Sequence, residues 1–76
     1  MMMRPVVIFF NDEKPYVMDV GLHLNSIRLE YPDGNIADLP VMSVRVHNNA
    51  RREEYYVASD RELNDAEVTA AINEFF

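Results

Sequence analysis

A turn near the middle of the chain constrains the fold more than any other sequence feature. Residues 31–35 are Tyr-Pro-Asp-Gly-Asn. Proline presets φ for the first turn position, and glycine accepts the positive φ that a tight turn or bulge requires. Residues 26–31 alternate between apolar and charged side chains, which is typical of a half-buried strand. We therefore predict an antiparallel hairpin that pairs residues 26–31 with residues 35–39 and places Gly34 at positive φ.

Further strands are predicted on both sides of this hairpin. Residues 6–10 are Val-Val-Ile-Phe-Phe, a β-branched and aromatic run that suits a strand buried on both faces. Residues 16–20 alternate weakly, and residues 54–58 are the last predicted strand. Pro40 is expected to break or bend the chain, because proline cannot donate a ladder hydrogen bond. Strand character resumes over residues 41–47, with Met42, Val44 and Val46 on one face and Ser43, Arg45 and His47 on the other.

The C-terminal residues have the pattern of a helix. Two capping-box patterns come first, at residues 59–62 and 64–67, and the second places Asn64 at the N-cap. The first box predicts either a short capped turn or an extension of the same helix backwards. The apolar residues that fall on one helical face are Val68, Ala71, Ile72, Phe75 and Phe76.

These elements predict one α+β domain over residues 1–76. A chain of 76 residues has room for a single domain. We expect an antiparallel meander of about five strands within residues 5–58, curled over one helix at about residues 60–76. The alternative is an SH3-like barrel with the helix as a cap.

Residues 16–46 resemble the core of a Tudor or SH3-like small barrel. The resemblance rests on the strand 27–31, the turn that ends in Asp33-Gly34-Asn35, and the strands that follow. It implies an aromatic cage for methylated lysine or arginine, with Tyr31 and Asn35 at matching positions. Asp33 stands where a Tudor domain usually has a second cage aromatic, and the chain has no tryptophan.

The charge balance bears on the class of partner. The formal net charge is -6 and the isoelectric point about 4.6, and such a chain repels a phosphate backbone at long range. The apolar run over residues 6–10 is too short for a signal peptide or a membrane helix. The absence of cysteine fits a reducing compartment. We therefore predict a cytoplasmic protein without membrane contact.

Residue types that carry catalysis or bind metals are sparse. His23 and His47 are far apart, and no metal-ligand spacing connects them. Residues 33–38 contain part of a calcium-loop pattern but lack its closing glutamate. No serine lies in a nucleophile elbow, and two glycines in the whole chain do not make a phosphate-binding loop. We predict no enzymatic activity, no cofactor and no metal site.

A basic and aromatic patch around the second predicted hairpin is the candidate binding site. Arginine beside aromatic rings suits an acidic protein partner or single-stranded nucleic acid. The apolar C-terminus either docks on the sheet or forms an interface, including a homodimer interface. The leading hypothesis is a protein-interaction module that regulates or inhibits a larger complex, and the alternative is a small barrel that binds nucleic acid or a modified peptide. The candidate partner-binding residues are Arg45, His47, Arg51, Arg52, Tyr55, Tyr56 and Phe76.

Overall fold

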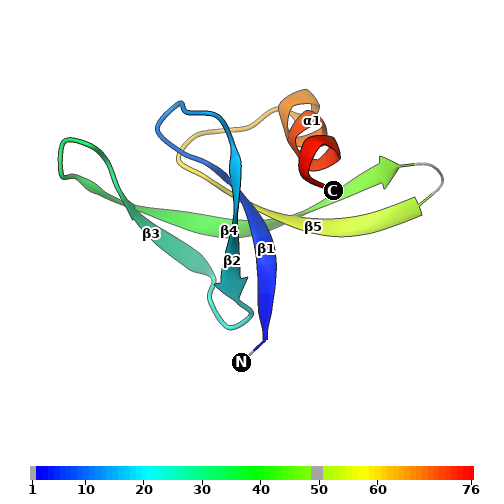
Figure 1. Cartoon of the computed structure of the whole chain (residues 1–76), viewed down its shortest axis with the longest axis horizontal. Helices are drawn as coiled ribbons and strands as arrows, with labels where there is room; N and C mark the ends of the chain where they lie inside the picture. The colour runs from blue at the N-terminus through cyan, green and yellow to red at the C-terminus, as the bar shows by residue number, and fades with distance from the viewer. Residues whose placement is uncertain (1, 49–50) are drawn as a thin grey trace.

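The computed structural model describes residues 2–48 and 51–76, and for residues 47, 48 and 51–53 it describes the backbone alone. Within these residues the chain forms a five-stranded sheet and one C-terminal helix (Figure 1). This confirms the predicted α+β class. The strands are β1 (Met3–Phe9), β2 (Tyr16–Gly21), β3 (Ser26–Glu30), β4 (Ile36–Asn48) and β5 (Arg51–Ser59), and the helix is α1 (Asp65–Phe75).

The strand order corrects the predicted all-antiparallel meander. Along the sheet the order is β2-β1-β5-β4-β3, and β1 runs parallel to β5 from Val6↔Tyr56 to Phe9↔Ser59. The other paired neighbours are antiparallel. The physical reason lies in the apolar run of β1, which needs cover on both faces and therefore a central place in the sheet.

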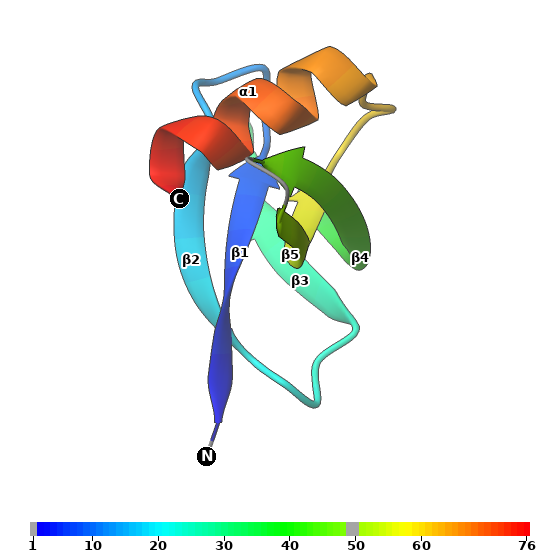
Figure 2. The same ribbon diagram turned by 90° about the vertical axis from the view of Figure 1, so that its right-hand side faces the viewer.

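The sheet curls into a half-barrel. Strands β2 and β3 lie at opposite edges of the sheet, yet residues 22–25 are all that connects them. A short connection between opposite edges requires the sheet to bend round until those edges approach (Figure 2). The Arg4 guanidinium fastens this connection by donating to the Leu24 carbonyl at 2.8 Å. The predicted barrel-like curl is thus confirmed.

Two apolar clusters lie on opposite faces of the sheet, and β1 contributes to both. The first cluster lies inside the curl, and the second lies between the sheet and α1. Alternate residues of β1 point into each, which confirms that this strand is buried on both faces. The inner cluster contains Val6, Ile8, Phe10, Val20, Ile27, Leu39 and Ala58. The helix-side cluster contains Val7, Phe9, Val46, Val57, Val68, Ala71 and Ile72.

The hairpin between β3 and β4 forms as predicted. Gly34 has a φ of 94°, and its N–H donates to the Tyr31 carbonyl at 2.9 Å. Asp33 Oδ1 accepts from the Asn35 N–H at 3.0 Å. The two strands pair from Ser26↔Pro40 to Glu30↔Ile36.

Pro40 does not break the strand, so the first of the two predicted effects is wrong, and a bend there stays a prediction. Strand β4 continues through it from Ile36 to Asn48. The proline lies where β4 changes partners, since pairing with β3 ends at Pro40 and pairing with β5 begins at Val41. A residue with only one ladder neighbour can lack an N–H at no cost to the sheet.

The helix begins five residues later than the predicted start near residue 60, at Asp65. Asn64 is the N-cap, and its Oδ1 accepts from the Glu67 N–H at 2.8 Å, which confirms the second capping box. The first box makes a short turn instead, because the Ser59 hydroxyl accepts from the Arg61 N–H at 3.0 Å. Val68, Ala71 and Ile72 are the buried residues of α1.

Candidate functional site

A groove with a volume of about 780 Å³ lies between β4, the segment that follows β5, and the first turns of α1. The late start of α1 creates it, because residues 60–64 run as a loop instead of as helix. The described residues that line the groove are Pro40, Met42, Val44, Arg45, Val46, Val57, Ser59, Asp60, Arg61, Glu62, Leu63, Asp65, Val68 and Thr69.

The floor of this groove is apolar. Val46 and Val57 are buried there, because they belong to the helix-side cluster. Met42 lies on β4, as Val46 does, but keeps 41% of its surface exposed. The cluster under α1 ends before it reaches this side chain, which is why a large flexible apolar group lines an open groove.

The rim of the groove carries more acidic than basic charge. Asp60, Glu62 and Asp65 are the acidic residues of the lining, and the carboxylate of Asp60 accepts hydrogen bonds from within the fold. Of the two arginines, Arg61 donates from Nη1 to Glu67 Oε1 at 2.6 Å, so its charge is largely balanced. Arg45 is the other cation at the groove. A basic or apolar ligand therefore suits this site better than an anionic ligand.

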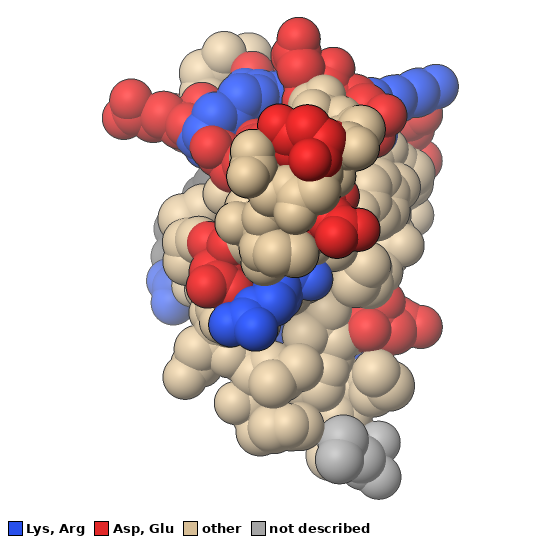
Figure 3. Space-filling model, turned by 90° about the vertical axis from the view of Figure 1, so that its left-hand side faces the viewer, with Lys and Arg blue, Asp and Glu red and all other residues tan. Residues whose placement is uncertain are grey.

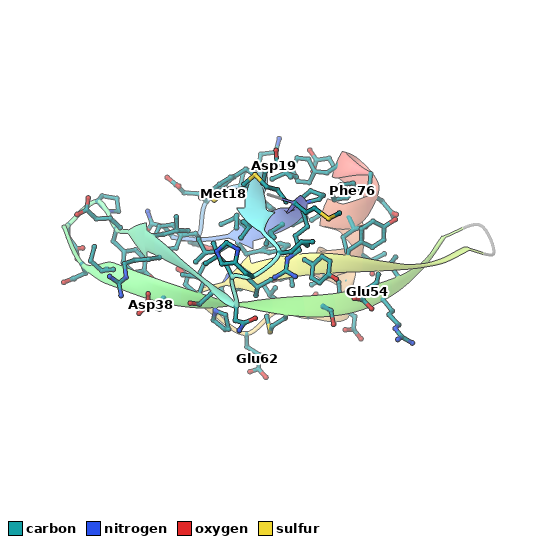
Figure 4. All side chains as sticks on the ribbon, turned by 90° about the horizontal axis from the view of Figure 1, so that it is seen from below. Met18, Asp19, Asp38, Glu54, Glu62 and Phe76 are labelled. Atoms are coloured by element: carbon teal, nitrogen blue, oxygen red, sulfur yellow. The ribbon has the colours of Figure 1, made fainter. Side chains whose placement is uncertain are left out.

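The two tyrosines of the predicted patch lie on opposite faces of β5. The ring of Tyr55 packs against Phe76 with centroids 5.2 Å apart, at the end of α1. The ring of Tyr56 lies under the Arg4 guanidinium at 4.4 Å, and its hydroxyl donates to Glu54 Oε1 at 3.0 Å. Figure 4 labels Phe76 beside the C-terminal end of α1 and Glu54 on β5. The structure thus does not bring Tyr55 and Tyr56 together in one site.

The basic part of the predicted patch follows the β4–β5 hairpin. Arg45 is exposed and pairs in register with Glu54, and the backbones of His47 and Arg52 lie opposite each other. The side chains of His47, Arg51 and Arg52 lie outside the described part, so their role stays a prediction. Figure 3 shows the side on the left of Figure 1, away from the β4–β5 hairpin, and there acidic and basic side chains lie interspersed.

The structure also contains a polar contact that sequence reasoning missed. Asp60 Oδ2 accepts from the Tyr31 hydroxyl at 2.9 Å and from the Asn11 N–H at 2.9 Å. The Tyr31 ring stacks on Phe10 with centroids 4.5 Å apart. This hydrogen bond, together with burial and the charges of Asp60 and Asp33, raises the pKa of Tyr31 above its ordinary value. The ring and the hydroxyl of Tyr31 thus both make contacts within the fold. The Tudor resemblance had implied instead that Tyr31 lines a ligand-binding cage.

The described residues bring together no group of three or more histidine, cysteine, aspartate or glutamate side chains suited to a metal ion. No helix in the described part is long and apolar enough to cross a bilayer.

Comparison with known families places the chain. A family model described as the YnfN protein family matches residues 28–75. The chain belongs to this family. No curated protein and no solved structure matches it.

The YnfN match covers the part of the chain that builds the groove. Residues 28–75 include most of β3 and all of β4, β5 and α1, and the groove lining falls between Pro40 and Thr69. Strands β1 and β2 precede the matched residues. The groove is therefore made from the YnfN-matched region alone, whereas the inner strand β1 lies outside that region.

Proposed function

We propose that this YnfN-family chain is a small, non-enzymatic module that binds another protein, and that the partner docks in the groove between β4 and α1. The observation that carries the proposal is the exposed apolar floor at Met42, within a groove with a mainly acidic rim. Exposed apolar surface enclosed by polar groups is the usual character of a protein-binding site. A regulator or inhibitor of a larger cytoplasmic complex fits this proposal.

The negative charge of the chain indicates which kind of partner surface is complementary to the groove. The chain has a net charge of -6, and three acidic residues line the groove. A partner surface with apolar side chains and nearby basic groups is complementary to both features, and opposite charge speeds its encounter with the groove.

The test compares two substitutions on the same strand. Met42→Asp places a charge on the groove floor. Ile36→Asp places the same charge on β4 outside the groove, at a side chain that is 54% exposed. We expect the wild-type chain and Ile36→Asp to capture the same protein from a cytosolic extract, and Met42→Asp to lose it. Capture that is equal for all three chains would contradict the groove as the binding site.

Nucleic-acid binding remains the alternative prediction, and Arg45 is the described residue that favours it. About three arginine contacts to phosphate imply a salt slope near -2 for a single strand. Tight binding of a single-stranded oligonucleotide that Arg45→Ala weakens, while Met42→Asp leaves it unchanged, would favour the nucleic-acid alternative over the groove.

A further inference from the structure

Strand β4 has an open edge beside the groove. Pairing with β3 ends at Pro40, and the Val41 N–H makes the last bond on that side, to the Asn25 carbonyl at 2.9 Å. Beyond Val41, β4 continues to Asn48 with β5 on its other side. In the described part of the chain, no strand pairs with this second half of β4 on the β3 side.

The residues whose backbone groups face the open edge follow from alternation. Successive residues of a strand direct their N–H and C=O groups to opposite edges. The Val41 N–H and the Asn35 carbonyl both bond on the β3 side, so the odd-numbered residues of β4 face that side. Ser43 and Arg45 therefore present their N–H and C=O groups to the open edge, while Met42, Val44 and Val46 bond toward β5.

The same alternation links the edge to the groove. The side chains of Met42, Val44 and Val46 line the groove. A strand added along the open edge continues the pleat of β4, so every second side chain of that strand lies on the groove face. The edge and the groove therefore form one composite site, in which backbone bonds supply affinity and the groove selects side chains.

We propose that the open edge of β4 takes up an extended segment of a partner protein as an added strand, with apolar and basic side chains alternating over the groove. This rests on the proposed function and names its binding mode. The exposed Met42 suits an apolar side chain, and the exposed Glu62 and Asp65 suit the head of an arginine whose stem lies on the floor. The partner is a different protein and not a second copy, because each copy brings a net charge of -6 and the same acidic rim.

The main test removes the edge donor and keeps the fold. Ser43→Pro deletes an N–H that faces the open edge, and proline is tolerated on such an edge. Ser43→Ala keeps the N–H and is the matched control. The probe is a synthetic peptide in which threonine alternates with valine and arginine, and a second peptide replaces arginine by glutamate. Isothermal titration calorimetry measures binding, and circular dichroism verifies folding.

We expect the arginine peptide to bind the wild-type chain and Ser43→Ala equally. For Ser43→Pro its Kd rises at least about tenfold, the loss expected for one to two edge hydrogen bonds. The glutamate peptide binds the wild-type chain more weakly than the arginine peptide. Equal binding by Ser43→Pro and Ser43→Ala overturns strand addition, and absence of binding by the arginine peptide overturns it as well. The groove proposal is tested separately, by the capture experiment. If Met42→Asp fails to capture the protein that the wild-type chain captures, the groove proposal holds even when strand addition is overturned.

A second measurement covers the case in which Ser43→Pro unfolds. Methylation of alternate peptide nitrogens blocks one edge of the peptide strand at a time. Methylation of the nitrogens that face β4 should abolish binding to the wild-type chain. Methylation of the alternate nitrogens, which face away from β4, should leave binding intact. Equal effects of the two sets contradict strand addition. Sedimentation without peptide tests self-association, and a dimer that Ser43→Pro dissociates would identify a second copy as the occupant and overturn the partner assignment.

Discussion

Asp60 joins three parts of the molecule that are distant in sequence. Its carboxylate accepts from Tyr31, before the β3–β4 turn, and from the backbone of Asn11, in the β1–β2 turn. Asn11 and Asp12 have positive φ angles of 57° and 54°, a conformation that non-glycine residues rarely adopt. The bond from the Asn11 N–H therefore helps to hold a strained turn in place.

The contact between Tyr31 and Asp60 predicts a loss of stability at alkaline pH. The hydrogen bond to Asp60, burial and the charges of Asp60 and Asp33 raise the pKa of folded Tyr31 above 10.0. A group with a raised folded pKa contributes stability that is complete below its unfolded pKa and is lost as pH rises through the folded pKa. Urea unfolding between about pH 8 and about pH 11 should show a steeper loss for the wild-type chain than for Tyr31→Phe. Parallel curves for the two chains would show that Tyr31 does not contribute.

Gly34 should be sensitive to substitution because of its backbone and not because of crowding. Its φ is 94°, and a Cβ built at this position meets no atom within 4 Å. Gly34→Val should therefore cost about 1–3 kcal/mol through backbone strain. Gly34→Asn is the control, because asparagine tolerates a left-handed conformation and should cost less. Thermal midpoints measure the difference, and equal midpoints for wild type and Gly34→Val would be inconsistent with a strained turn.

At the scale of elements, α1 depends on the sheet for its stability. A helix of 11 residues is marginal alone in water, and this one packs Ile72 against the sheet at 2% exposure. Ile72→Ala should cost about 2–5 kcal/mol, a large share of the stability of so small a protein. The exposed Asn73 gives the control Asn73→Ala, which should change little. Chemical denaturation measures both, and a stable Ile72→Ala protein would show that α1 is not part of the core.

The C-terminal residue allows a separate test of helix docking. Phe76 is 51% exposed, yet its ring packs against Tyr55. A docked aromatic pair predicts that Phe76→Ala lowers the free energy of unfolding by about 0.5–1.5 kcal/mol. A double-mutant cycle with Tyr55→Ala isolates the pair. If Phe76→Ala leaves the melting point unchanged and weakens self-association instead, the tail is an interface.

At the scale of the whole molecule, the features that could be predicted from the sequence are those that depend on residues near one another in the chain. The turn at Gly34, the doubly buried strand over residues 6–10 and the cap at Asn64 each depend on residues close to one another in the chain. The position of α1 against the sheet followed from the spacing of Val68 and Ile72.

Features that depend on distant partners were not predictable in the same way. Nothing local indicates that β1 pairs with β5, or that Tyr31 and Asp60 meet. The continuity of β4 through Pro40 was not predictable either, because it depends on which neighbours lie on each side of the strand. The groove escaped prediction for a similar reason, since Met42 is exposed only because the cover over the sheet ends before it.

The parallel pairing of β1 with β5 has a consequence for synthesis on the ribosome. The register joins Val6 to Tyr56, so β1 cannot complete its pairing until β5 has emerged, about fifty residues later in the chain. Contacts of such long range slow folding, and until they form, apolar side chains of β1 such as Val7 and Phe9 stay without cover from α1. A nascent or truncated chain that ends before β5 therefore exposes a β-branched, aromatic strand to water, which favours aggregation and capture by chaperones.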